Sequence, residues 1–131
     1  MKTYALRLLP GQDIKTELIK FTRENGIQAG FVITAVGSVT KARLRMADER
    51  VIKDFDAKHE IVSMVGTLCQ KDVHIHMSLS DAEGRVIGGH LKEGCIVYVT
   101  VELVVGEAEE YRFDRQPDPA TGFDELTISK I

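Results

Sequence analysis

Three of the four histidines of this chain lie within one short stretch, at positions 74, 76 and 90. His74 and His76 alternate with apolar residues, the pattern of a half-buried strand. Successive side chains of a strand point to opposite faces, so these two imidazoles share one face. Neutral imidazole is a common zinc ligand, and a third one would leave a fourth coordination position for water or substrate.

The position of the third histidine relative to the other two depends on the turn that follows this strand. Residues 81–85 read Asp-Ala-Glu-Gly-Arg, with Gly84 where a three-residue hairpin loop needs a left-handed residue. With 82–84 as the loop, Asp81 pairs with Arg85. Five residues further from the loop along each strand, His76 then lies opposite His90. Such cross-strand neighbours have Cβ atoms about 4.5–5.5 Å apart.

We therefore expect His74, His76 and His90 to form a metal site, with zinc as the expected ion. Gly88 and Gly89 precede the third histidine and allow either a β-bulge or a close backbone approach that would orient its ring. The alternative is that the histidines are polar residues on the solvated face of an amphipathic hairpin.

Glu102 is the candidate catalytic residue, because it is a carboxylate within an apolar strand-like run. A carboxylate in that position is costly unless it is paired or hydrogen-bonded. It could support a metal-bound histidine, act as general base beside a metal-bound water, or simply face outward. We favour the structural role. His59-Glu60 begins a zinc-protease pattern, but Ser63 stands where the second histidine is required.

Two arginines offer a further possibility. Arg43 and Arg45 alternate with apolar residues, so they share a strand face and could clamp an anion. We favour the alternative, in which they belong to an ordinary solvated face.

The bulk properties favour one domain spanning residues 1–131, with a core of its own. The net charge of −3 gives no basic field for nucleic acid. The start of the chain lacks a signal-peptide pattern, and the longest apolar run, 95–105, is too short to cross a bilayer. Cys69 and Cys95 lie in apolar runs and are expected to be buried free thiols, which indicates a cytoplasmic protein without membrane contact.

The hydrophobic periodicity predicts a helix at about 12–25, ended by Gly26, and otherwise mostly antiparallel strands. The fold class is therefore α+β, with the helix on one sheet face. A continuous apolar segment, 30–36, indicates a strand covered on both faces. The remaining strands are expected at 2–9, 39–47, 51–55, 60–69, in the two arms of the histidine hairpin 73–90, at 95–106, 111–115 and, at an edge, 126–131. Residues 116–122 are expected to be a loop.

Several of these motifs together resemble the plants-and-prokaryotes conserved (PPC) domain family in its stand-alone prokaryotic form. The most specific are His74-Ile75-His76, Gly88-Gly89-His90-Leu91, Gly94 and Tyr98; Gly37-Ser38, residues 59–66 and residues 121–126 support them. The resemblance covers nearly the whole chain.

The resemblance implies an antiparallel sheet flanked by helix, a homotrimer, and a zinc site at His74, His76 and His90 near a subunit interface. It also implies that Arg115 reaches a carboxylate near that interface. Plant members join the domain to AT-hook segments, which lie in the DNA minor groove. This sequence has no such segment, so direct nucleic-acid binding is not expected.

The sequence thus favours a trimeric zinc-binding regulatory module that binds a small ligand or a protein partner, with no second catalytic group identified. One alternative is a zinc-dependent hydrolase, in which the metal lowers the pKa of a bound water toward about 7 and Glu102 is the base. The other is a DNA-binding, transcription-associated protein.

Overall fold

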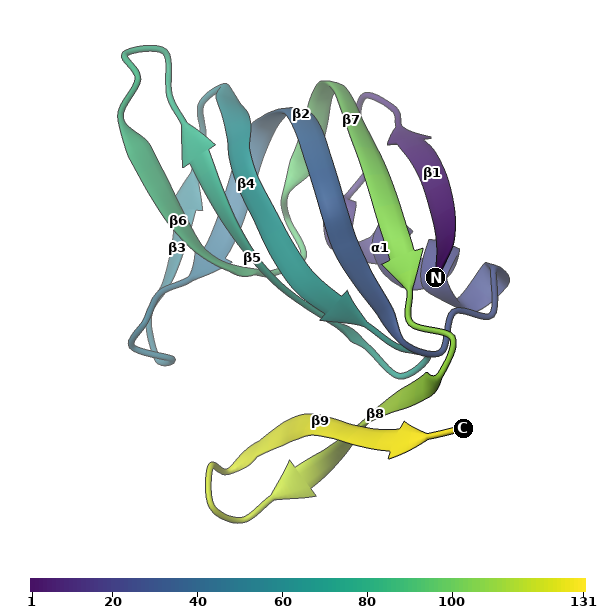
Figure 1. Cartoon of the computed structure of the whole chain (residues 1–131). Helices are drawn as coiled ribbons and strands as arrows, with labels where there is room; N and C mark the ends of the chain where they lie inside the picture. Colours follow the sequence, from purple (N-terminus) through teal and green to yellow (C-terminus); the bar gives the residue numbers. More distant parts are fainter.

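The computed structural model describes all of residues 1–131, which form a mostly antiparallel β-structure with a single helix (Figure 1). This confirms the α+β prediction. The elements in chain order are β1 (Lys2–Leu8), α1 (Ile14–Glu24), β2 (Gly30–Arg45), β3 (Ile52–Phe55), β4 (His59–Leu68), β5 (Val73–Ser80), β6 (Val86–Leu91), β7 (Ile96–Glu107), β8 (Tyr111–Asp118) and β9 (Phe123–Lys130).

Seven strands form one sheet in the order β1-β7-β2-β4-β5-β6, with β3 paired to β2. The 16-residue strand β2 organises it: β2 lies between β7 and β4 along its first half and pairs with β3 and β6 near its end. The sheet therefore curls back on itself, and β6 meets β2 a second time. Register shifts along β2 mark the bulges that bend it, including one between Gly37 and Val39.

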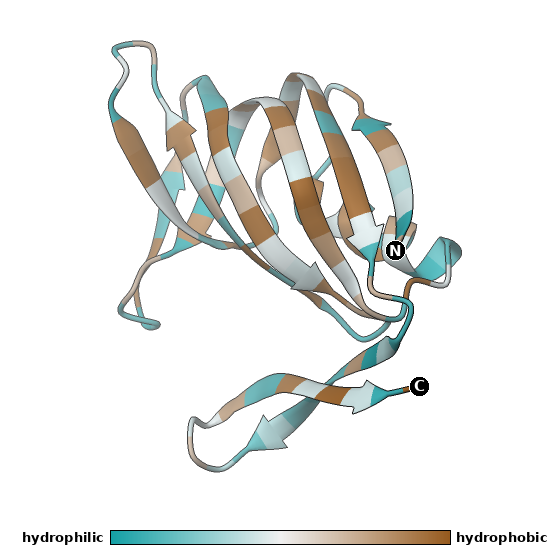
Figure 2. Ribbon diagram, viewed as in Figure 1, coloured by the Kyte–Doolittle hydropathy of each residue, from teal (hydrophilic) through white to brown (hydrophobic).

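The helix forms where the periodicity predicts it, within one or two residues at each end. Asp13 caps its start, because its Oδ1 accepts a hydrogen bond of 2.9 Å from the backbone N–H of Thr16. Gly26, with φ of +63°, ends it. Ile14 and Leu18 are fully buried and join the inward-facing side chains of the strands in one core. The alternation of apolar and polar residues along the strands is visible as banding (Figure 2).

Two sequence predictions about strands were wrong. Residues 30–36 are not covered on both faces: Ile33 and Val36 are about half exposed, at 46% and 57%. The expected loop at 116–122 is shorter, because β8 continues to Asp118. Pro117 is tolerated there since both strands of a two-stranded sheet are edges, where a missing N–H costs no ladder bond.

The C-terminal hairpin of β8 and β9 forms a second, two-stranded sheet, which extends away from the main sheet (Figure 1). The segment expected at 126–131 is thus an edge strand of this hairpin and not of the main sheet. Backbone N–H groups of Ala108 and Phe113 donate to the carbonyls of Ala29 and Gln28, at 2.9 and 3.0 Å, and tie the hairpin to the body. That residues 1–131 form a single domain stays a prediction.

Both cysteines are buried free thiols, as predicted. Burial raises the pKa of Cys95 to about 11, so this thiol stays protonated. The one helix, 11 residues long, is too short to span a membrane.

Candidate metal centre

The hairpin between β5 and β6 has the predicted loop. The Asp81 N–H donates to the Arg85 carbonyl at 2.9 Å, and Gly84 has a φ of +82°. Asp81 also accepts hydrogen bonds of 2.9 Å from the N–H groups of Glu83 and Arg85 through Oδ1. These bonds hold the pKa of Asp81 below its usual value. The hydrogen bonds of the loop and the positive φ of Gly84 therefore set the register of the two strands.

That register brings the three histidines together. His76 pairs with His90 across β5 and β6, and His74 lies two residues along β5. The ring centroids are 5.0 to 5.6 Å apart. A ring nitrogen from each lies within 4.8 Å of those of the other two.

The geometry fits a zinc ion. Zinc–nitrogen bonds of about 2.0–2.1 Å in a tetrahedron place the nitrogens roughly 3.4 Å apart. The rings thus need to close by roughly 1 Å, which rotation about their side-chain bonds supplies. None of the three imidazoles makes a hydrogen bond within the chain, and Nδ1 of His90 is buried without a partner; only His59 is bonded, to the Ala57 carbonyl at 2.9 Å.

The surroundings keep the imidazoles of His74 and His90 neutral. Burial, and after it the nearby Arg45 charge, lowers the pKa of His90 to about 4. Burial and then the Arg115 charge lower the pKa of His74. A neutral imidazole has a lone pair for a metal, so both residues are ready to bind one at neutral pH.

A close backbone contact fixes the third ligand. His90 pairs not only with His76 but also with Arg45 on the returning end of β2. A Cβ at Gly89 would lie 2.6 Å from the Arg45 carbonyl oxygen, which leaves room for no residue but glycine. Of the two predicted roles for Gly88 and Gly89, the close approach is confirmed; the β5–β6 register runs through them without a bulge.

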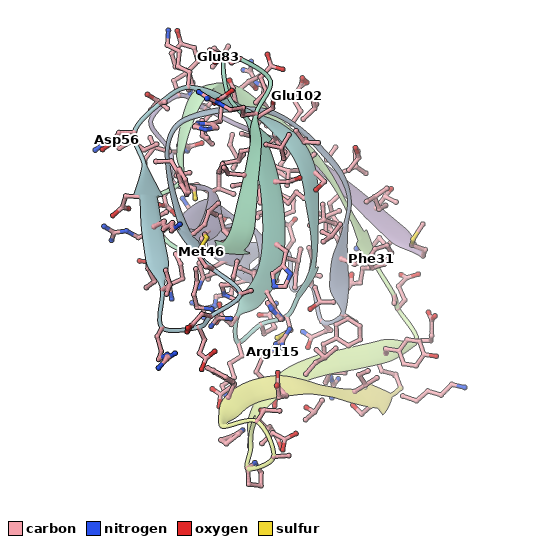
Figure 3. All side chains as sticks on the ribbon, turned by 90° about the vertical axis from the view of Figure 1, so that its left-hand side faces the viewer. Phe31, Met46, Asp56, Glu83, Glu102 and Arg115 are labelled. Carbon is pink, nitrogen blue, oxygen red and sulfur yellow. The ribbon has the colours of Figure 1, made fainter.

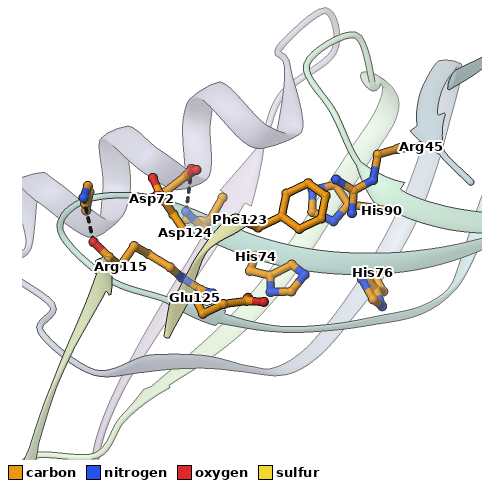
Figure 4. Close-up of a pocket in the computed structure, with 11 residues that line it drawn as sticks. Arg45, Asp72, His74, His76, His90, Arg115, Phe123, Asp124 and Glu125 are labelled. Carbon is orange, nitrogen blue, oxygen red and sulfur yellow. Dashed lines mark hydrogen bonds between the residues drawn. The ribbon is translucent and has the colours of Figure 1, made fainter. Parts of the chain in front are cut away.

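The histidines line a cavity of about 520 Å³ that lies between the main sheet and the C-terminal hairpin (Figure 4). His74 and His90 are half-buried in it, whereas His76 is exposed. The other walls come from three places: Arg45 on β2, residues 71–73 at the start of β5, and Arg115, Phe123, Asp124 and Glu125 on the hairpin. The carboxylate of Glu125 points toward His74 (Figure 4).

The hairpin residues of this wall were not assigned to the site from the sequence, apart from the role that the resemblance gave to Arg115. Phe123 and Glu125 begin a strand about 35 residues beyond His90. Only the packing of β8 and β9 below β5 brings them to the histidines, and no local pattern encodes that packing.

Glu102 lies elsewhere. It is exposed on β7, between the buried Val101 and Leu103. Two strands, β2 and β4, separate β7 from β5 in the sheet, and Glu102 is not among the residues that line the histidine cavity. Figure 3 shows Glu102 at the opposite end of the molecule from Arg115. This placement matches the outward-facing role and gives Glu102 no part in chemistry at this cavity.

The two arginines of β2 also separate. Arg43 pairs with Asp54 on β3, with Nε 2.7 Å from Oδ1, whereas Arg45 lines the cavity. Arg115 is buried and donates to the hydroxyl of Thr67 at 2.9 Å; it reaches no carboxylate within the chain.

Comparison with known families places this fold and site. The model of the Plants and Prokaryotes Conserved (PCC) domain matches residues 1–109, that is, everything before the C-terminal hairpin. The chain belongs to this family. The resemblance of the motifs to the PPC domain, the same family under its other abbreviation, is thereby confirmed.

Curated relatives carry the PPC domain within longer chains. The whole chain is 50% identical to part of the "Bifunctional protein GlmU" of a Synechococcus strain, and the match covers 21% of that protein. It is also 27% identical over 115 residues, 79% of this chain, to "AT-hook motif nuclear-localized protein 13" of Arabidopsis thaliana, of which it covers 26%. The chain thus spans about a fifth to a quarter of the length of these relatives.

Solved structures of PPC-like proteins superpose over nearly the full length. A hypothetical protein from Salmonella has a TM-score of 0.94 at 40% identity, over 98% of this chain and 94% of that one. A protein from Archaeoglobus fulgidus that is described as metal-containing has a TM-score of 0.77 at 29% identity, over 97% of this chain and 94% of that one.

Proposed function

We propose that this PPC-domain protein is a homotrimeric zinc-binding regulatory module that binds a small ligand or a protein partner beside its metal. The observation that carries the proposal is the convergence of His74, His76 and His90, whose nitrogens lie within 4.8 Å of one another at the wall of a cavity. The metal-containing relative from Archaeoglobus supports it.

The donor set favours zinc. Three neutral imidazoles suit zinc and its transition-metal neighbours, whereas magnesium and calcium require mostly oxygen ligands. Three protein ligands leave one tetrahedral position open. Since His74 and His90 both line the cavity, that position is directed at the space where a ligand would sit.

The outer face of the sheet supports a trimer. Ile33 and Val36 on β2, Val62 and Val65 on β4, and Val99 on β7 are each between 46% and 58% exposed. Apolar side chains that gather on one sheet face are expected to be covered by another surface. We propose that further copies of this chain cover them, as the family resemblance implies.

The architecture of the relatives supports a modular role. The matching region forms about a fifth of a protein described as bifunctional and about a quarter of an AT-hook protein. In these proteins the domain is joined to other segments, which favours a modular role. Two buried free thiols fit the reducing cytoplasm as its location.

A zinc-dependent hydrolase is the second candidate. One observation favours it: Glu125 lines the cavity with its carboxylate toward His74, so a base is available there although Glu102 is not. DNA binding is the third candidate. The AT-hook relatives from Arabidopsis favour it, and the net charge of −3 opposes it.

The test is the metal content of untagged protein, together with its mass in solution. Wild type should carry about one zinc per chain and have the mass of three chains. His76→Ala should lose the zinc, because it removes a direct ligand; loss of a merely supporting partner already costs roughly 10–100-fold in affinity.

His59→Gln is the matched control, since His59 is the one histidine outside the cluster. It should keep its zinc. Absence of metal in wild type after zinc is supplied, or equal metal in both variants, contradicts the assignment. Hydrolysis of ester or phosphoester substrates that Glu125→Gln abolishes would favour the enzyme.

A further inference from the structure

Two arginines line the histidine cavity without a carboxylate partner. The chain has seven salt bridges, and neither Arg45 nor Arg115 takes part in any of them. Arg115 is only 7% exposed. A buried charge is normally paired, because its desolvation is otherwise uncompensated. The cavity wall also carries the carboxylates of Asp72, Asp124 and Glu125. None of them lies within ion-pair distance of these two guanidinium groups.

Their hydrogen bonds are also incomplete. The Nε–H of Arg45 is buried and has no acceptor. One buried donor without a partner costs about 1–3 kcal/mol, and charged groups cost more. The guanidinium of Arg115 makes a single side-chain contact, from one terminal nitrogen to the Thr67 hydroxyl at 2.9 Å. Each guanidinium thus has N–H groups available to an acceptor in the cavity.

The two side chains lie on either side of the histidine cluster. Arg45 is next to His90, its cross-strand partner, and Arg115 lies beyond His74 toward the hairpin (Figure 4). Phe123 holds Arg45 in place, with the guanidinium carbon 5.6 Å from the ring centroid. Both guanidinium groups thus share the cavity with the three histidines that would hold a metal.

We propose that the ligand of this cavity is a small organic acid, whose carboxylate binds the open metal position and accepts hydrogen bonds from Arg45. This inference rests on the proposed zinc site. The planar guanidinium presents paired N–H groups that match a carboxylate, and charged hydrogen bonds of this kind are the strong ones.

Other wall residues define the rest of the ligand. Arg115 lines the same cavity and has N–H groups free beyond its bond to Thr67, so it would receive a second anionic group, which favours a diacid over a monoacid. A cavity of about 520 Å³ accommodates several carbon atoms beyond one carboxylate. Asp124 and Glu125 at the hairpin wall carry negative charge, so they exclude large polyanions and would accept from a hydroxyl or amino group on the ligand.

The experiment is calorimetric titration of zinc-loaded protein at constant ionic strength. Succinate is the probe, succinamide its uncharged match, and acetate and inorganic phosphate distinguish a monoacid and a phosphate. Succinate should bind and succinamide should not. Arg45→Met should weaken succinate binding by about tenfold or more while zinc content stays the same.

Arg43→Met is the control, because Arg43 lies on the same face of β2 but is paired with Asp54. It should bind succinate as wild type does. Equal affinity in Arg45→Met and wild type, binding of succinamide, or no binding of succinate by zinc-loaded protein would each overturn the inference and leave the metal site standing. Tighter binding of phosphate than of succinate would overturn the choice of an organic acid. Failure to load zinc would overturn the proposed function and this inference together.

Discussion

The resistance of zinc binding to acid follows directly from the buried imidazoles. An ordinary imidazole with a pKa near 6.5 is about 90% neutral at pH 7.5 and about 9% neutral at pH 5.5, a loss of roughly tenfold. Three such ligands would weaken zinc binding about 1000-fold over this range, because each proton competes with the metal. The pKa of His90, lowered to about 4 by burial and by Arg45, removes it from that competition.

We therefore expect zinc affinity to fall by no more than about 100-fold between pH 7.5 and 5.5, and by less still because burial also lowers the pKa of His74. Proton release gives a second measure. At pH 5.5, three ordinary imidazoles would release about 2.7 protons per zinc, whereas this site should release fewer than two. A metal-bound water with a pKa near 7 adds little at that pH.

The assay is calorimetric zinc titration at both pH values, in pairs of buffers with different ionisation enthalpies. The lowered pKa of His90 also predicts how the stability of the metal-free protein depends on pH. A pKa lower in the folded than in the unfolded chain means that the unfolded chain takes up more protons between about pH 6.5 and 4, so stability falls as the pH falls through that window. A 1000-fold loss of affinity, with close to three protons released, would refute the reasoning.

Three further predictions concern single side chains. Gly66→Ala should cost about 1–3 kcal/mol of unfolding free energy in urea denaturation and weaken zinc binding, because the new Cβ would lie 2.2 Å from the backbone oxygen of His74; unchanged values would show that the strands part freely. Glu102→Gln should leave zinc content and any hydrolysis unchanged, and a loss of either would return Glu102 to the site. Val62→Lys should give monomers in light scattering with zinc still bound, whereas a persistent trimer would place the interface elsewhere.

The convergence of the three histidines could be predicted from the sequence because everything that positions them is local. Strand alternation puts His74 and His76 on one face, and the loop 82–84 sets the register that brings His90 opposite His76. Each step depends on residues within about ten positions of the next. The same locality explains why the helix was found: its apolar stripe and Gly26 lie in one continuous segment.

The walls of the cavity could not be predicted in the same way. Arg45 and Arg43 look alike in the sequence, since both are basic residues on one strand face. What separates them is the pairing of the bent β2, which places Asp54 on β3 beside Arg43 and His90 on β6 beside Arg45. This pairing joins segments that are distant in the sequence, and the register shifts along β2, one of them between Gly37 and Val39, bend the strand before it reaches β3 and β6.

The hairpin of β8 and β9 connects the metal centre to the stability of the chain. An isolated two-stranded hairpin is marginally stable in water. This one is held by a few bonds to the body, among them Lys71 Nζ to the Arg115 carbonyl at 2.6 Å and Arg115 to Thr67. Both contacts lie at the cavity. An anion that pairs with Arg115 would therefore stabilise the wall that encloses it, so binding of the ligand and ordering of the hairpin are expected to favour each other.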